Sequence, residues 1–365
     1  MTRVSRARRL LRSGVTTANH RLKLFLILVV LAGTAFGSLG QITRAYAATT
    51  GETQYFVLSQ YGYYVSHTVR YDNGSWQPGW DAPNAPANIT DVAMAYDGIP
   101  GETQYAVVTS SGYMYHAIRY ANGSWTSFNY VTTPYPGYVQ AVAASGDGIA
   151  GEVQFMITTI YPCLCNGTPW HGIRYPNGYW SGFNQTSNNA SYVGDVSAAY
   201  DGNVGEVQFT LISSAPNPGN LPGHLLHRIR YSNGSWSAGW GLPPGDPANS
   251  GQPDWDVSSA WDGVSGEALF GVATNASYSD AMYTAIRYSN GYWSGFHGVN
   301  NAGANIYAVA VTYGGTYGVT MFLLANSNGT LTHGARWANG GYSSFGTPPY
   351  APSNIVEVAA TWDGQ

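Results

Sequence analysis

The sequence predicts an all-β protein, a β-propeller of four-stranded blades, with six blades expected first and seven as the alternative. A segment of the type DVAMAYDG (91–98) recurs five more times in close or looser form, at intervals of 49 to 61 residues. An Asn-Gly pair follows a strand-like segment in every repeat, and residues 48–365 show no sustained helical periodicity. A repeat near 50 residues with four short strands per unit is typical of propeller blades.

The best-kept part of the repeat is a ten-residue segment with an arginine, an Asn-Gly pair and a final aromatic residue. Its six copies are HTVRYDNGSW (67–76), HAIRYANGSW (116–125), HGIRYPNGYW (171–180), HRIRYSNGSW (227–236), TAIRYSNGYW (284–293) and HGARWANGGY (333–342). Asn-Gly between strands predicts a type I′ turn, because that turn needs positive φ at both central positions. In that register Tyr71 opposes Trp76 and Arg70 opposes Gln77. The arginines and the tryptophans are therefore expected on opposite faces of each blade.

The order of the strands predicts how the ring is closed. The first strand of each unit is the DVAMAYDG type, and the second is the GETQYFVL type (51–58). The third ends at the arginine, and the fourth begins at the final aromatic residue. The propeller region starts with a second strand and ends with a first strand, EVAATWDG (357–364). We therefore expect the C-terminal strand to join the N-terminal blade and leave no open sheet edge there.

The first 47 residues predict an export signal. They hold eight Lys or Arg residues and no acid, followed by the apolar run 24–40 and the sequence Ala45-Tyr46-Ala47. This pattern is typical of a signal peptide, here residues 1–47, cleaved after Ala47. Residues 48–365 would then form a single propeller domain that is secreted and has no stable membrane insertion. The alternative is that the apolar segment is retained as a membrane anchor.

The charge of residues 48–365 excludes some partners. This region has no lysine, and seven basic residues face nineteen acidic ones, a formal charge of −12. Such a surface does not suit nucleic acid or an anionic membrane. Cys163 and Cys165 leave three possibilities open: a local bridge, free thiols or a bridge to a partner. Two thiols do not make a zinc site, and we expect no metal and no cofactor.

The carboxylates do not predict catalysis. Fourteen of the nineteen acids occupy repeated positions. The unrepeated ones are Asp72, Asp81, Asp246, Asp254 and Asp280. A glycosidase needs one specific acid–base pair, whereas the repeated Asp-Gly steps favour turns. The repeated histidines fall in different blades, so we expect them to be structural.

The ten-residue segment and its flanking strands resemble the blade motif of the PLL-like bacterial propeller lectins. The resemblance spans residues 51–364, and it departs from that family in the blade count, which is seven there and six here. It implies sugar binding at several sites between blades, without implying which residues contact the sugar. The composition agrees, with 29 Tyr and 12 Trp but only 9% charged residues.

We therefore expect an exported, multivalent carbohydrate-binding lectin whose partners are glycans or glycoconjugates. The alternatives are an exported glycan-cleaving propeller enzyme and a protein-interaction scaffold, and the oligomeric state stays open. The expected sugar contacts are Arg70, Arg119, Arg174, Arg230, Arg287, Arg336, Trp76, Trp125, Trp180, Trp236 and Trp293. The competing interpretation is that each arginine satisfies carbonyls between blades. Variable connections between second and third strands, and between fourth and first strands, favour that end of the ring for function.

Overall fold

The computed structural model describes residues 52–60, 64–160, 167–186, 193–213, 223–250, 254–274, 282–303 and 305–365. Internal contacts divide the chain after Ala47, and all described residues belong to the second part, 48–365. Cys163, Cys165 and Asp280 lie outside the described residues. None of the described segments is a helix long and apolar enough to cross a membrane.

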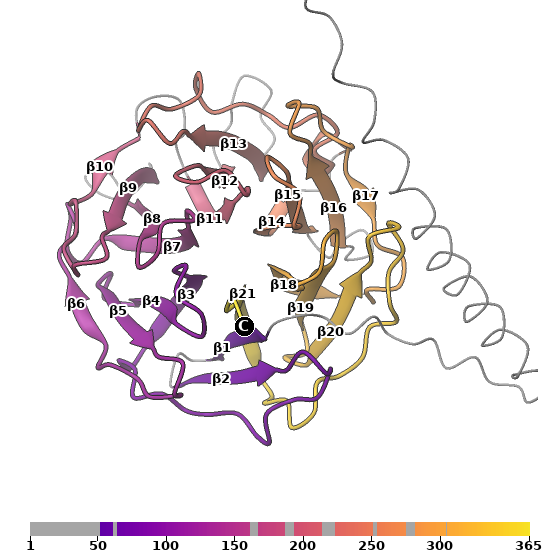
Figure 1. The fold of residues 1–365 in the computed structure, drawn as a ribbon, viewed down its shortest axis with the longest axis horizontal. Coiled ribbons are helices and arrows are strands. Elements are labelled where there is room, and N and C mark those ends of the chain that lie inside the picture. Colours follow the sequence, from indigo (N-terminus) through magenta and orange to yellow (C-terminus); the bar gives the residue numbers. More distant parts are fainter. Residues whose placement is uncertain are drawn as a thin grey trace, which may run out of the picture. The chain divides into compact units, whose positions relative to one another are not determined.

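Six blades surround a central axis (Figure 1), and we number them by the order of their second strands. The inner strands of blades 1 to 6 are β21 (Ile355–Trp362), β3 (Ile89–Tyr96), β7 (Val139–Gly146), β11 (Val193–Tyr200), β14 (Asp254–Trp261) and β18 (Ile306–Tyr313). The second strands are β1 (Thr53–Ser59), β4 (Thr103–Thr109), β8 (Val153–Thr159), β12 (Val207–Ser213), β15 (Ala268–Thr274) and β19 (Thr320–Asn326). The third strands are β2 (Val65–Arg70), β5 (Met114–Arg119), β9 (Thr168–Arg174), β13 (His224–Arg230), β16 (Met282–Arg287) and β20 (Leu331–Arg336).

The fourth strand does not begin at the final aromatic residue as predicted, because that residue forms only an isolated bridge with the arginine. It is the two- or three-residue strand β6 (Asn129–Val131), β10 (Asn184–Gln185) or β17 (His297–Gly298) in blades 2, 3 and 5. In blades 1, 4 and 6 it is reduced to isolated bridges, such as His67 with Asp81. Pro78 and Gly79 interrupt the outer segment of blade 1, and neither residue suits a regular ladder. A single 3-10 turn, η1 (Pro247–Ser250), precedes β14.

The last strand of the chain pairs with the first. β21 runs antiparallel to β1, with Thr53 opposite Trp362 and Phe56 opposite Ala359. It also contacts β18 of blade 6 and β3 of blade 2. The two ends of the propeller region therefore share blade 1, as the strand order predicts.

The hairpin turns differ from the predicted type I′ turn. The N–H of Gly74 donates to the Tyr71 carbonyl at 2.9 Å, and Gly74 alone of its Asn-Gly pair has positive φ, 82°. This is a type I turn followed by a glycine bulge, which adds one residue to the loop. The extra residue shifts the register, so Arg70 opposes Trp76 and not Gln77. The same bridge joins each arginine to the final aromatic residue in the other five blades. The predicted separation of arginine and tryptophan onto opposite faces is therefore wrong.

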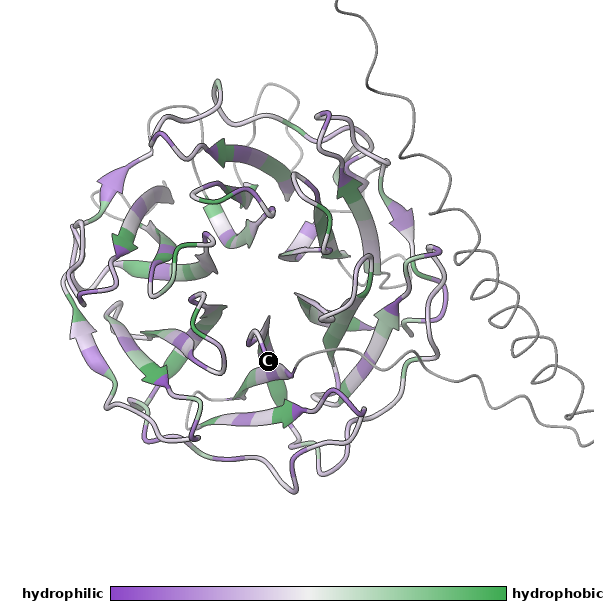
Figure 2. Cartoon of the chain, viewed as in Figure 1, coloured by the Kyte–Doolittle hydropathy of each residue, from purple (hydrophilic) through white to green (hydrophobic). Residues whose placement is uncertain are grey.

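The hydrophobic core lies between neighbouring blades. The second strands of blades 1 to 5 are buried along their whole length, and Figure 2 shows hydrophobic residues concentrated along the strands. Tyr55 and Val358 of blade 1, for example, pack with Leu323 of blade 6. Each blade therefore has one face toward the preceding blade and one toward the following blade.

Candidate functional site

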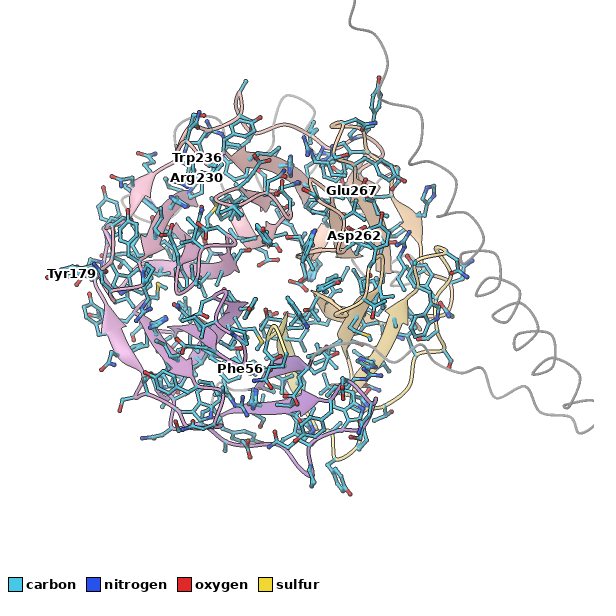
Figure 3. All side chains as sticks on the ribbon, viewed as in Figure 1. Phe56, Tyr179, Arg230, Trp236, Asp262 and Glu267 are labelled. Atoms are coloured by element: carbon cyan, nitrogen blue, oxygen red, sulfur yellow. The ribbon has the colours of Figure 1, made fainter. Side chains whose placement is uncertain are left out.

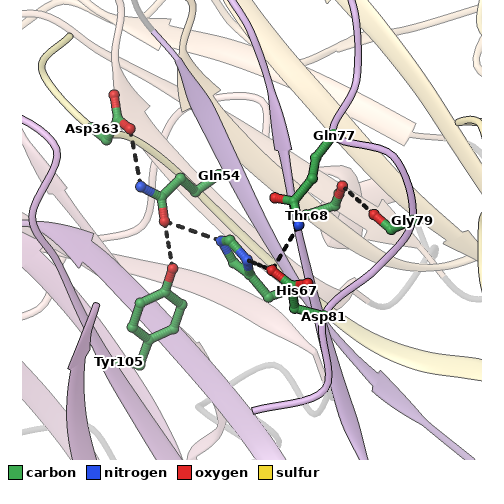
Figure 4. A network of polar contacts seen from close by, with 8 residues as sticks. All are labelled: Gln54, His67, Thr68, Gln77, Gly79, Asp81, Tyr105 and Asp363. Atoms are coloured by element: carbon green, nitrogen blue, oxygen red, sulfur yellow. Dashed lines mark hydrogen bonds and ion pairs between the residues drawn. The ribbon is translucent and has the colours of Figure 1, made fainter. Parts of the chain in front are cut away.

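A buried His–Gln–Asp triad links three strands in each of blades 1 to 4. In blade 1, Gln54 Nε2 donates to Asp363 Oδ2 at 3.0 Å, and Gln54 Oε1 lies 3.1 Å from His67 Nε2 (Figure 4). The Tyr105 hydroxyl of blade 2 donates to the same Oε1 at 2.6 Å. The other triads are His116–Gln104–Asp97, His171–Gln154–Asp147 and His227–Gln208–Asp201.

The glutamine of the triad sets the protonation state of the histidine. Its amide donates to the carboxylate, so its oxygen must accept, and the histidine donates from Nε2 as a neutral ring. Burial lowers the pKa of His67 to about 4, and it lowers the pKa of His116, His171 and His227 to about 3. Within the described residues, no group of three His, Cys, Asp or Glu side chains is arranged to hold a metal ion. The triads therefore connect strands within a blade.

The tryptophans of the ten-residue segments pack between blades. Trp125 of blade 2 meets His67 of blade 1 edge to face, with 5.4 Å between ring centroids, and it lies 4.5 Å from the Tyr105 ring. The equivalent pairs are Trp76 with His333, Trp180 with His116, Trp236 with His171 and Trp293 with His227. All five indoles are half-buried. Packing between blades therefore accounts for most of their surface.

Each arginine folds back over the turn of its own hairpin. Arg174 Nη2 lies 3.7 Å from the position that a Cβ on Gly178 would take. Because Arg174 shares a blade face with Trp180, and Trp180 packs on His116, the guanidinium lies toward the preceding blade. The arginines and the tryptophans that the sequence proposed as sugar contacts are thus adjacent, as Figure 3 shows for Arg230 and Trp236.

A glutamate of the preceding blade lies near four of these arginines. Burial, followed by Asp97, raises the pKa of Glu102 to about 7, although Arg174 of blade 3 acts in the opposite direction. We call these residues the Arg–Glu pairs. The four pairs are Arg119 with Glu52, Arg174 with Glu102, Arg230 with Glu152 and Arg287 with Glu206.

The members of these pairs are neighbours without forming an ion pair. In the part of the chain that the structure describes, no salt bridge joins Arg119, Arg174, Arg230 or Arg287 to a glutamate. The Arg119 Nε atom is buried with no hydrogen-bond partner. Burial lowers the pKa of Arg174 and of Arg287. Each blade interface of this kind therefore carries guanidinium donors and a carboxyl acceptor that are not engaged with each other in an ion pair.

A tyrosine of the preceding blade completes the arrangement. Tyr120 acts to raise the pKa of Arg174 of blade 3, and Tyr231 acts to raise the pKa of Arg287 of blade 5. Both tyrosines directly follow the arginine of their own hairpin, and Tyr120 is 39% exposed. An aromatic ring with accessible surface thus accompanies the charged groups at these interfaces.

The last two interfaces differ from the other four. At the interface of blades 5 and 6, Glu267 holds the glutamate position, but Arg336 does not act on its pKa and acts only on that of Asp262. Between blades 6 and 1, the buried Val319 takes the place of the glutamate beside Arg70. The six arginines that the sequence treated as equivalent therefore fall into at least two classes.

The Arg–Glu pairs lie at the end of the ring formed by the hairpin turns. The strand ends that the long variable connections join, which the sequence favoured for function, lie at the opposite end. Much of those connections, including 161–166 and 214–222, lies outside the described residues. The sugar contacts expected at the arginines and the function expected at the variable connections therefore concern opposite ends of the ring.

The described unrepeated acids of blades 4 and 5, Asp246 and Asp254, are buried. His224 Nδ1 lies 2.8 Å from Asp246 Oδ2, and burial, followed by Asp246, raises the pKa of Asp254 to about 10. Asp246 and Asp254 are 2% and 3% exposed. They stabilise the connection before β14 and do not form an accessible carboxylate pair.

The sequence analysis missed the glutamates and the tyrosines. Glu52, Glu102, Glu152 and Glu206 were counted among repeated, structural acids. The available signal was that Gly-Glu and Arg-Tyr recur in phase in the same repeats. Their meeting across a blade interface depends on the shifted hairpin register, which the Asn-Gly pattern did not predict.

The fold is similar to solved propellers that include lectins and a glycosidase. A lectin from Burkholderia pseudomallei has a TM-score of 0.56 and 18% identity, covering 83% of this chain and 81% of its own. The six-bladed fucose-recognising lectin of the fungus Aleuria aurantia has a TM-score of 0.54 and 14% identity, covering 84% and 93%. An α-L-arabinofuranosidase from Fusarium graminearum has a TM-score of 0.52 and 11% identity, covering 71% and 80%. No protein-family model and no curated protein matches the chain. At these identities the likeness establishes a six-bladed β-propeller fold.

Proposed function

We propose that the protein is a multivalent carbohydrate-binding lectin with its sites at the blade interfaces. The observation that carries this proposal is the Arg–Glu pair, which recurs at four interfaces without an ion pair. A sugar hydroxyl accepts a hydrogen bond from a guanidinium and donates one to a carboxylate at the same time. The adjacent tyrosine and tryptophan rings offer apolar surface to the C–H face of a sugar ring.

The repetition of the site favours binding over catalysis. Individually weak sites, on the order of mM to μM, gain strength when a multivalent glycan engages several of them. The lectins of similar fold support this class of ligand. We infer that the chain is a six-bladed relative of the PLL-like lectins.

Glycan cleavage is the alternative, because an arabinofuranosidase shares the fold. The four pairs are equivalent, whereas a glycosidase builds one acid–base pair. Asp254→Asn should leave glycan binding nearly unchanged, because Asp254 is buried and its raised pKa of about 10 keeps it protonated at neutral pH. Turnover of a bound glycan that this change abolishes would favour the enzyme.

We infer that the lectin acts outside the cytoplasm after removal of residues 1–47. The basic segment, the apolar run and Ala45-Tyr46-Ala47 support this inference. The mass of the exported protein tests it, with an N-terminus at Ala48 expected. Recovery of the whole chain in the membrane fraction would favour an uncleaved anchor.

A glycan array probed with the exported protein tests the binding proposal. The control is a variant with Arg119, Arg174, Arg230 and Arg287 all changed to alanine, checked for an intact thermal melt. We expect the native protein to bind a defined set of neutral glycans and the variant to lose that binding. Equal binding by a folded variant would overturn the assignment of the sites.

A further inference from the structure

An axial cavity of about 130 Å³ lies at the hairpin end of the ring, where the inner strands finish. That is well above the roughly 10–15 Å³ that one water needs. One aromatic side chain from each of five blades surrounds it, and we call this set the axial collar. Its members are Tyr96, Tyr200, Trp261, Tyr313 and Trp362.

The rings of the axial collar form a connected series around the axis. The centroids of Tyr200 and Trp261 are 5.6 Å apart, and those of Trp261 and Tyr313 are 4.9 Å apart. Tyr313 lies 5.1 Å from Trp362, which lies 5.3 Å from Tyr96. Several of the ring pairs meet edge to face, so π faces of different orientation surround one space.

Blade formation does not require these rings. Blade 3 carries Gly146 at the equivalent position, and its four strands nevertheless form. The five collar side chains are also half-buried, unlike the fully buried aromatic residues of the second strands. Four of the rings also pack on the Asp-Gly turn of the preceding blade, as Tyr200 does on Gly148 and Trp261 on Gly202, and their remaining surface lines the cavity.

Carboxylates lie close behind the axial collar. Burial raises the pKa of Tyr96, and Asp97 and Asp363 raise it further. Burial also raises the pKa of Tyr200, and Asp201 and Asp147 raise it further. The pKa of Tyr313 is raised by burial and then by Asp262. No Arg, Lys or His is among the described residues that line the cavity. Its wall otherwise consists mainly of small residues such as Ala144, Ala199 and Ala260.

We propose that the axial collar binds a small organic cation of the quaternary ammonium class, one per chain. Aromatic faces attract such a cation through their quadrupoles, and this attraction strengthens when the cation is desolvated. The nearby carboxylates add attraction for positive charge. A hard metal ion favours carboxylate ligands, and no Asp or Glu is among the described residues that line the cavity. The collar is a single site on the axis, distinct from the Arg–Glu pairs at the interfaces.

Titration of the full chain with tetramethylammonium chloride tests this proposal, followed by calorimetry and tryptophan fluorescence. The matched probe is 3,3-dimethylbutan-1-ol, which has a similar apolar end without the charge, and sodium chloride keeps the ionic strength constant. We expect saturable one-to-one binding of the cation and much weaker binding of the alcohol. Equal binding of the two probes, or no saturable binding of the cation, would overturn the proposal.

Two substitutions at Tyr313 test whether its aromatic ring contributes to cation affinity. Tyr313→Phe keeps the ring and should keep most of the affinity, whereas Tyr313→Leu should weaken it roughly 2- to 30-fold. Trp255→Leu is the control, because Trp255 is exposed near the other end of the axis. Retained affinity in a folded Tyr313→Leu variant would contradict the proposal. The axial collar contains no member of the Arg–Glu pairs, so this test does not depend on the carbohydrate sites.

Discussion

Blades 1 to 4 and blades 5 and 6 fill the same buried positions with different chemistry. The first four hold the His–Gln–Asp triad. In blade 5 the glutamine and histidine positions hold Leu269 and Thr284, and in blade 6 the aspartate and glutamine positions hold Gly314 and Met321. Leu269 and Met321 are fully buried. An apolar residue can therefore replace the central amide when the remaining polar group has another partner. In blade 5 the retained Asp262 accepts from the Val264 N–H, and in blade 6 the retained His333 pairs with the Tyr55 hydroxyl.

The arginine behaves differently from the triad. It is present in all six blades, including the two that have lost the triad, and in each it opposes the final aromatic residue of the segment. The arginine is therefore kept where the triad is lost, and beside intact triads it also acts on the triad aspartate of the preceding blade, as Arg174 does on Asp97 and Arg287 on Asp201. This difference separates a set of polar residues that vary together from an arginine that every blade keeps.

The largest effect is expected from removing the strand that completes blade 1. Deletion of residues 354–365 removes β21 and with it Asp363 of the first triad. It also exposes one edge of β1 and the core formed with blade 6. We expect the loss to approach the whole stability of a domain, about 5–15 kcal/mol. Circular dichroism should then show no cooperative melt, whereas deletion of Gln365 alone should leave the melt intact.

A cooperative melt that is only slightly lowered by the longer deletion would contradict this account. It would show that β21 frays independently of the other blades. The importance of the β1–β21 pairing for the ring would then be refuted, although the pairing itself would stand.

A smaller effect is expected from breaking one triad without changing its partners. Gln208→Leu leaves His227 and Asp201 buried without the amide between them. Each unpaired group should cost about 1–3 kcal/mol. Leu269→Met at the same position of blade 5 should cost less than about 1.5 kcal/mol. Denaturant unfolding measures both, and equal costs would remove the distinction between the two groups of blades.

The triad histidines should make stability depend on pH. Burial lowers the pKa of His227 to about 3 in the folded protein, from an ordinary value near 6.5. The folded state then binds fewer protons than the unfolded state, so this contribution is present above pH 6.5 and is lost as pH falls toward 3. Buried carboxyls with raised pKa values, such as Asp91 and Glu357, act in the opposite direction.

A substitution isolates the histidine contribution from that background. Between pH 6.5 and 4, the free energy of unfolding should fall less steeply in His227→Gln than in the native protein. The two slopes should differ by at most about 1.4 kcal/mol per pH unit. Above pH 7 the unfolding free energies of the variant and of the native protein should change with pH in parallel. Parallel curves at all pH values would show that His227 is not held neutral by the fold.

The repeat made the fold predictable from the sequence, because period, strand order and turn residues all agree on one architecture. The site was less predictable. Whether Arg70 meets Trp76 or Gln77 depends on a single extra residue in the turn, and Asn-Gly occurs in both turn types. The Arg–Glu pairs also join residues about 70 positions apart, such as Glu102 and Arg174, on different blades. No local pattern encodes that contact.

If the four Arg–Glu pairs bind sugar, their number should appear as the stoichiometry of binding. Calorimetric titration with the best array ligand should give four sites per chain. Arg174→Ala should reduce this number by one and change the melting temperature by less than about 2 °C. Arg70→Ala is the matched control and should keep all four sites, because Val319 replaces the glutamate at that interface. Full stoichiometry in Arg174→Ala together with a clearly lowered melting temperature would contradict the account, because it would make the arginine a structural residue.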